Sequence, residues 1–311
     1  MSITSGYQQY MRKYRVLVIP KTGGTGLDVS ALRCTFYVDK SVSETPNYSQ
    51  IAIYNLSRDT ISSIKAGDTV ILEAGYENGN FGMIFTGQIV QPHIVREGGT
   101  DLVLTLICQD GDAFLNSSFT ATTISAGSTH SDIVAVCTKK SGTPMQTGML
   151  TESLATKVLP RGKTLFGRSA KYLSNVAAAA QSQFYIEDGV VNIVAASDYS
   201  ANKAVELNPM TGLIGTPSQT DDGVSAQCLI NPSIKLNTLV YINASLVAAK
   251  QASASSETAV AGVNTDGIYR IVKLVYEGDT RGDTWYCTFE AITQSGAKPD
   301  GLVGDATNPW R

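Results

Sequence analysis

Hydrophobic and polar residues alternate along most of the first 116 positions, and this period of two constrains the fold more than any other feature. In the clearest run, residues 32–39, Leu32, Cys34, Phe36 and Val38 share one side. Turns rich in Gly, Asn and Asp separate this run from four similar ones, at residues 51–53, 70–74, 81–85 and 102–108. Many short strands at regular spacing, each with one buried face, predict an antiparallel β-barrel or sandwich.

A helical period replaces the alternation after residue 116. Ser128 or Thr129 can cap a first helix, and a second helix is predicted over about 164–182. The segment FYIEDGVVNIV, residues 184–194, then contains two short strands around an Asp-Gly pair, which is a strong hairpin signal. Residues 117–204 are therefore predicted to form a small α+β domain.

The strand pattern returns at residue 205 and ends in a long hairpin. Its arms are residues 268–276 and 285–291, which EGDTRGD, residues 277–283, joins. We expect a mobile loop at 248–267, a stretch rich in Ala and Ser. The predicted fold class is mainly β with an α+β insert, divided into a first β domain, the insert, a second β domain and a C-terminal tail: residues 1–116, 117–204, 205–292 and 293–311.

Charge is scarce, and this limits the classes of partner. Charged residues make up 16% of the chain, against about a quarter in typical globular proteins. The 24 Lys and Arg against 27 Asp and Glu leave a net charge of −3. Such a balance gives no counterion-release drive toward nucleic acid and no polybasic membrane anchor. A charge-poor surface on a chain with many strand edges favours self-association.

The five cysteines are widely spaced and never form a Cys-x-x-Cys pair. We therefore expect buried, reduced thiols instead of a disulfide framework or a zinc ribbon. No stretch approaches the roughly 18 apolar residues of a membrane span, and no apolar segment follows the first basic residues. These features predict a protein folded in a reducing compartment, without membrane insertion.

No pattern of catalytic, cofactor-binding or metal-ligating residues stands out. The two histidines, His93 and His130, lack a nucleophile elbow or a second metal-ligand histidine. The glycines of TGGTG, residues 22–26, lack the spacing of a phosphate-binding loop and indicate a turn. The acidic clusters lie in predicted turns, where turn chemistry explains them. We expect no enzyme activity, no cofactor and no metal.

The order of three pairs of segments is more specific than any single motif. The pairs are IAIYNLSRDTISSIKAGDTVILEAGY with FTGQIVQ (51–76, 85–91), LPRG with FYIEDGVVNIV (159–162, 184–194), and LNPMTGLIGTPSQTDDGVSAQCLINPSIKLNTLVYI with GIYRIVKLVYEGDTRGDTWYCTFEAI (207–242, 267–292). In this order they resemble the baseplate hub proteins of contractile-tailed bacteriophages. The resemblance covers about residues 15–292 and consists of strand ends and turns.

This resemblance implies two antiparallel β-barrels, similar to the tail-tube subunit, that flank the insert. It further implies a structural virion protein that forms a homotrimer in the tail baseplate and is assembled in the host cytoplasm. Its partners would be the hexameric tail tube, the trimeric central spike and other baseplate proteins, and its ring would leave a pore for genome ejection. Neither sequence-specific nucleic acid binding nor membrane insertion is expected.

Exposed aromatic residues and glycine-rich hairpin tips are typical of protein interfaces. We therefore expect contacts with neighbouring baseplate parts at the hairpin tip and near the C-terminus, through Glu277, Gly278, Asp279, Arg281, Asp283 and Trp310. Two alternatives to the hub remain open. One is another tail component with tube-like barrels, such as a distal-tail or tube-end protein, and the other is an envelope-degrading or glycan-binding tail protein.

Overall fold

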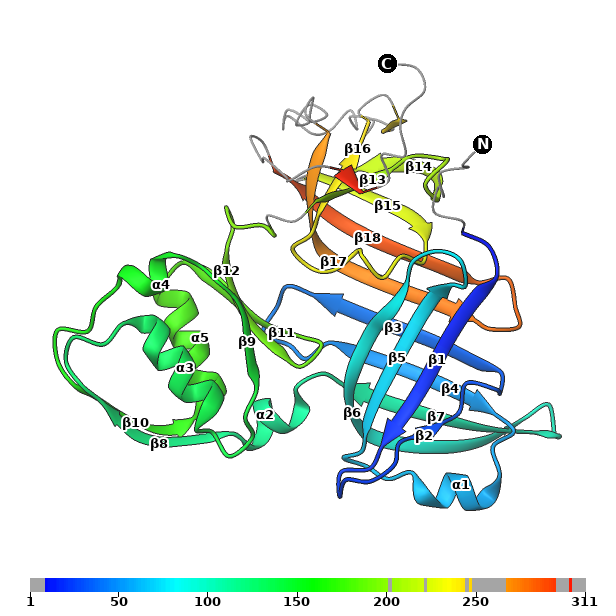
Figure 1. Ribbon diagram of the computed structural model, residues 1–311, viewed down its shortest axis with the longest axis horizontal. Helices are drawn as coiled ribbons and strands as arrows, with labels where there is room; N and C mark the ends of the chain where they lie inside the picture. Colours follow the sequence, from blue (N-terminus) through cyan, green and yellow to red (C-terminus); the bar gives the residue numbers. More distant parts are fainter. Residues whose placement is uncertain are drawn as a thin grey trace, which may run out of the picture.

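A computed structural model describes residues 9–200, 203–220, 223–243, 246–247, 267–294 and 302–303. The described chain is mainly β, as predicted, with a large sheet on one side and a smaller α+β segment on the other (Figure 1). Among these residues no helix is long and apolar enough to cross a membrane. Residues 248–266, most of the predicted mobile loop, lie outside the described residues, as does Trp310.

The first β segment contains seven strands and one short helix. Alternate residues of its strands are buried, as the period of two predicts. The helix begins where the Ser57 side chain accepts a hydrogen bond from the Thr60 amide, at 3.1 Å. The elements are β1 (Arg12–Ile19), β2 (Leu27–Asp28), β3 (Cys34–Ser41), β4 (Tyr48–Tyr54), α1 (Arg58–Ser63), β5 (Thr69–Tyr76), β6 (Phe81–Glu97) and β7 (Asp101–Gln109).

The second β segment also contains seven described strands. The predicted long hairpin is present as β17 and β18, and the turn between them is shorter than predicted. The elements are β13 (Ala204–Leu207), β14 (Leu213–Gln219), β15 (Gly223–Leu229), β16 (Leu239–Ile242), β17 (Ile268–Asp279), β18 (Trp285–Thr293) and β19 (Leu302–Val303).

Hydrogen bonds join the two β segments into one 14-stranded sheet. Its main path runs β14-β15-β18-β17-β3-β4-β7-β6-β5-β1-β2, and β16, β13 and β19 branch from β17. The junction is β17, whose first residues pair with β16 of its own segment. After an irregularity between Ile271 and Lys273, the same strand pairs antiparallel with β3, from Lys273 opposite Ser41 to Asp279 opposite Thr35. One apolar core continues through both segments.

The middle segment has its own apolar core, in which α3 and α5 pack against the sheet β11-β12-β9. A second, two-stranded ribbon pairs β8 with β10. The elements are α2 (Asp112–Ser117), β8 (Phe119–Ile124), α3 (His130–Lys139), β9 (Gln146–Leu150), α4 (Ser153–Thr156), β10 (Lys163–Arg168), α5 (Ser169–Ala179), β11 (Ser182–Glu187) and β12 (Val190–Ala195).

Most of the local structure that the sequence predicts for the middle segment is confirmed. Thr129 caps α3, and its side chain and that of Asp132 form a reciprocal capping box. Asp188 and Gly189 both adopt positive φ, 53° and 77°, which is the backbone that the predicted tight hairpin needs. All five cysteines are buried and free.

Two predicted boundaries are wrong. The helix predicted over 164–182 begins at Ser169, because residues 163–168 pair with β8 and Gly167 has a φ of 154°, which a helix excludes. The predicted loop 277–283 is a turn only after Asp279, because β3 offers backbone partners that extend β17 by three residues. In both places a strand that is distant in sequence decides the local structure.

Gly278 is a sharp test of the packing between the two β segments. A Cβ at this position would lie 2.2 Å from the ring of Phe36, which is buried and packs edge-on against Trp285 at 5.4 Å. We expect Gly278→Ala to lower the free energy of unfolding by about 1–3 kcal/mol, because the crowded ring cannot move freely. Chemical denaturation measures the change. Gly82→Ala is the matched control, because its added methyl group meets no atom closer than 3.4 Å, and an equal loss in both variants would contradict the argument.

Candidate functional site

The structure places most of the predicted contact residues of the hairpin tip against the first β segment of the same chain. Glu277 and Gly278 lie within β17, opposite Tyr37 and Phe36 of β3. The Asp279 carboxylate pairs with the Arg33 guanidinium at 2.7 Å. This hydrogen bond from Arg33 holds the pKa of Asp279 below its ordinary value.

The turn after β17 is also held by the first β segment. Arg12 of β1 donates hydrogen bonds to the carbonyls of Gly282 and Asp283, at 2.5 and 3.0 Å. The side chains of Arg281 and Asp283 are exposed. These two side chains are thus accessible to a neighbouring protein, whereas Gly278 is buried and Glu277 and Asp279 are half-buried.

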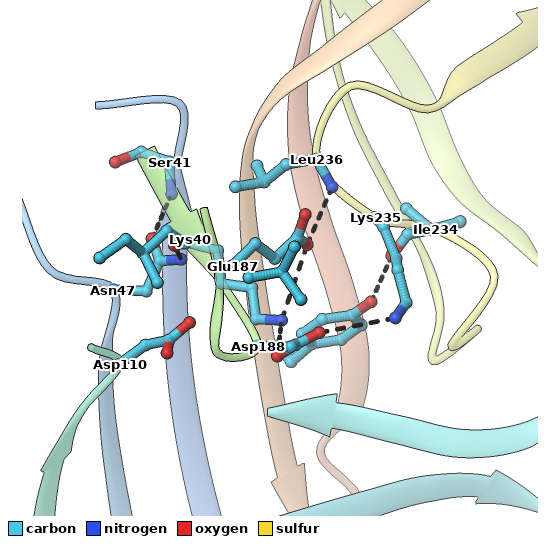
Figure 2. Close-up of polar contacts among 12 residues, drawn as sticks. Lys40, Ser41, Asn47, Asp110, Glu187, Asp188, Ile234, Lys235 and Leu236 are labelled. Carbon is cyan, nitrogen blue, oxygen red and sulfur yellow. Dashed lines mark hydrogen bonds and ion pairs between the residues drawn. The ribbon is translucent and has the colours of Figure 1, made fainter. Parts of the chain in front are cut away.

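A cluster of charged residues that the sequence analysis did not single out lies where the three segments meet (Figure 2). At its centre is Lys40 of β3, whose side chain is 1% exposed. Its Nζ lies 2.7 Å from Oδ1 of Asp188 and 3.7 Å from Oε1 of Glu187, both in the β11–β12 hairpin. A side chain from a strand of the first β segment therefore forms ion pairs with the hairpin of the middle segment.

The second β segment contacts the same hairpin. The Leu236 amide donates to Oε1 of Glu187 at 3.2 Å, and Nζ of Lys235 lies 3.5 Å from Oδ2 of Asp188. The loop that carries both residues is anchored to β17, because the Tyr276 hydroxyl donates to the Ile234 carbonyl at 2.5 Å. Asp188 thus lies between one lysine from each β segment.

Further contacts continue on either side of this charge cluster. The Asp110 carboxylate, at the end of β7, accepts a hydrogen bond from the Gly189 amide at 3.0 Å. Asn47 donates from its amide to the Ile186 carbonyl at 2.7 Å. On the other side, the buried Arg270 of β17 donates to Oδ1 of Asn237 and to the Asp198 carbonyl, at 2.9 and 3.1 Å. The end of β12 is thereby tied to the second β segment.

Charge in the cluster is unbalanced, and the pKa values reflect this. Three carboxyl groups, those of Asp110, Glu187 and Asp188, share two lysines, and Lys235 is 44% exposed. Burial opposes ionisation of Lys40, but the carboxylates of Asp188 and Glu187 outweigh it and hold the pKa of Lys40 above its ordinary value.

Two of the three carboxyl groups, those of Asp110 and Glu187, have pKa values above those of exposed carboxyl groups. Burial, followed by the charge of Asp188, raises the pKa of Asp110 to about 7. Burial also raises the pKa of Glu187, although Lys40 counteracts part of the effect.

This arrangement connects the three segments through ion pairs and hydrogen bonds. The Lys40 ammonium group pairs with the carboxylates of Asp188 and Glu187, whereas Oδ2 of Asp110 is buried without a hydrogen-bond partner among the described residues. The described residues contain no group of three His, Cys, Asp or Glu arranged to hold a metal ion. The sequence contains a pattern that could have identified Lys40 as a buried charged residue. It continues the buried side of the alternation after Cys34, Phe36 and Val38, where a charged side chain needs a buried partner. Its partners could not be identified, because they are 147 and 148 positions away.

We expect Lys40→Ala to lower the free energy of unfolding by about 3–5 kcal/mol, because it leaves two buried carboxylates without their central cation. Lys235→Ala is the matched control, since the more exposed Lys235 contributes at most about 1 kcal/mol. Urea denaturation at neutral pH measures both. Similar small losses in the two variants would show that the cluster does not hold the segments together.

Asp110 makes stability depend on pH. Its pKa is about 7 in the folded chain, against about 3.9 when unfolded. The folded state therefore holds an extra proton in this window, and the contribution of Asp110 to stability decreases as pH rises from about 4 to 7. Asp110→Asn cannot ionise, so the variant should gain stability relative to the parent at pH 8 compared with pH 4. Urea denaturation at both pH values measures this, and a constant difference would contradict it.

The sequence of this chain matches a known protein family. Residues 31–291 match the family described as Baseplate hub gp41. No sequence among the curated proteins matches the chain.

Solved structures with the same fold come from several bacteria. The 43 kDa tail protein of prophage MuSo2 from Shewanella oneidensis has a TM-score of 0.58 at 12% identity, covering 91% of this chain and 99% of its own. A tail protein from Neisseria meningitidis MC58 has a TM-score of 0.59 at 11% identity, covering 94% and 100%. The c3393 protein of E. coli, a component of the type VI secretion system, has a TM-score of 0.52 at 11% identity, covering 93% and 78%.

At these identities the structural likeness shows a shared fold, whereas the family match spans most of the sequence, from the first β segment through the middle segment and into β18. The chain belongs to the baseplate hub gp41 family and is a structural protein of the bacteriophage tail baseplate.

Proposed function

We propose that three copies of this chain form a ring at the centre of the baseplate, which joins the hexameric tail tube to the trimeric central spike. The ring leaves a pore through which the genome passes, and the protein acts mechanically, without catalysing a reaction. It assembles in the host cytoplasm before it becomes part of a contractile tail. The family match supports the hub assignment.

The observation that carries the proposal is the pairing of β17 with β3, which holds two β segments side by side in one sheet (Figure 1). A threefold ring of such chains presents six β segments. Six units on one face match a sixfold tube, while the chain itself repeats three times and so matches a threefold spike. A rigid connection between the two β segments is what such a symmetry adaptor needs.

Open strand edges supply surfaces for ring formation. Among the described residues, β6 pairs beyond Ile89 with β7 alone, so one edge of its last eight residues has no strand beside it. Three apolar side chains of this stretch, Val90, Ile94 and Val95, are 41%, 52% and 43% exposed. An exposed apolar edge of this kind is a site for strand pairing with a second copy.

The domain division belongs to the same proposal: β domains at 1–116 and 205–292, the insert at 117–204 and the tail at 293–311. Arg281 and Asp283 at the exposed hairpin tip, together with Trp310 in the tail, are proposed to contact other baseplate proteins. A distal-tail or tube-end protein is the second candidate, and its ring would contain six copies. The family match favours the hub over that candidate and over an envelope-degrading tail protein.

Mass photometry of the purified chain tests the proposal, and averaged electron images of its rings give their symmetry. We expect three copies and threefold symmetry, with no turnover of peptidoglycan. Six copies would favour the alternative component, and a monomer both in solution and in assembled tails would contradict the ring.

The double variant Ile94→Lys, Val95→Lys should shift the trimer toward monomer by at least about tenfold in dissociation constant, because charge on a strand edge blocks pairing. Met210→Lys is the control, because Met210 is 91% exposed but lies outside every strand. Both variants should keep the circular dichroism spectrum of the parent, which shows that each chain is folded. A trimer that resists the double variant would rule out β6 as the pairing edge.

A further inference from the structure

The outer face of the β8–β10 ribbon carries aromatic side chains that nothing described covers. Leu165, Thr120 and Ile124 point into the core of the middle segment, being 0%, 0% and 7% exposed. Their neighbours along the two strands therefore face outward. Among these, Phe166 is 73% exposed and Phe119 is 46% exposed.

The two phenylalanines form one site. Phe166 lies opposite Ala121 and Arg168 lies opposite Phe119, so that the rings are diagonal neighbours. Their centroids are 5.1 Å apart and the ring planes are at 90°. Val158, which is 58% exposed, lies in the segment that leads into β10. Large exposed aromatics in contact with one another are typical of surfaces that a partner covers.

The same stretch of chain is strongly basic. Residues 153–186 contain no Asp or Glu and five basic residues, all exposed: Lys157, Arg161, Lys163, Arg168 and Lys171. None of the five forms an ion pair with a carboxylate of the described residues. Arg168 lies opposite Phe119 and therefore shares the outward face of the ribbon, whereas Lys163 lies opposite the inward-pointing Ile124. A local excess of positive charge stands out in a chain whose net charge is −3.

We propose that the aromatic and basic face of the β8–β10 ribbon docks an acidic segment of another protein of the phage particle, with an apolar side chain of that segment packed on Phe166. The inference rests on the proposed function, because it takes the partner from the assembled tail.

Charge complementarity and ring geometry select this occupant. An acidic segment would pair with the exposed Arg168, which shares the outward face with Phe119, and with the exposed Arg161 just before β10, while the two phenyl rings supply the apolar centre. Nucleic acid fits less well. The edge-to-face rings do not present successive parallel faces for base stacking.

Photo-crosslinking in assembled particles tests the proposal. p-Benzoylphenylalanine is placed at position 166, particles are irradiated, and mass spectrometry identifies the linked peptide. We expect a link to another particle protein, in a peptide of net negative charge. The charge reversal Arg161→Glu, Arg168→Glu should reduce the yield at least tenfold. The control reversal Arg58→Glu, Lys65→Glu should preserve the yield, because it changes two exposed residues of the first β segment.

Several results would overturn the proposal. They are a link to nucleic acid, to lipid or to a second copy of this chain, a yield unaffected by the ribbon reversal, or no link in particles that contain the chain. Each of these leaves the hub assignment intact. Absence of the chain from purified particles would overturn both proposals. Melting of each purified variant verifies that it folds, and a ribbon reversal that unfolds the protein is replaced by Phe166→Ser with the probe moved to position 119.

Discussion

The antiparallel pairing of β17 with β3 is the interaction on which the rest of this structure depends. It joins residues more than 230 positions apart and turns two β segments into one sheet with a continuous core. It also covers one edge of β3 and the second half of β17, which would otherwise be open to aggregation. Because the pairing spans seven residue pairs, the two segments cannot rotate independently without breaking backbone hydrogen bonds.

The buried charge cluster lies on the same seam. Lys40 is opposite Leu274 of β17, so that the residue that contacts the middle segment belongs to the strand that joins the β segments. Burying charges costs free energy that pairing offsets incompletely. What the cluster provides is a constraint, because moving the hairpin away from Lys40 would leave buried charges without a partner. We infer that it fixes how the middle segment is oriented relative to the shared sheet.

Rigidity at the centre and unpaired groups at the periphery fit an architectural protein. The polar contacts of the hairpin tip with Arg12 and Arg33 are internal to the chain. Two features that no other described residue covers lie elsewhere, at the β6 edge of the sheet and on the ribbon of the middle segment. They differ in chemistry, one being an apolar strand edge and the other an aromatic surface that shares its face with Arg168. Because the two surfaces differ in chemistry, a partner that fits one of them does not fit the other.

The sequence by itself determined the features that depend on near neighbours. Alternation predicted the buried faces of β3 and β15, and Asp188-Gly189 predicted the hairpin, because side-chain period and turn chemistry act over a few residues. The wide spacing of the cysteines predicted free thiols. Tertiary structure alone decided that residues 163–168 pair as a strand, that Asp279 continues β17, and that Lys40 meets Glu187 and Asp188. Each of these outcomes requires a partner that is distant along the chain, and no local pattern encodes the identity of that partner.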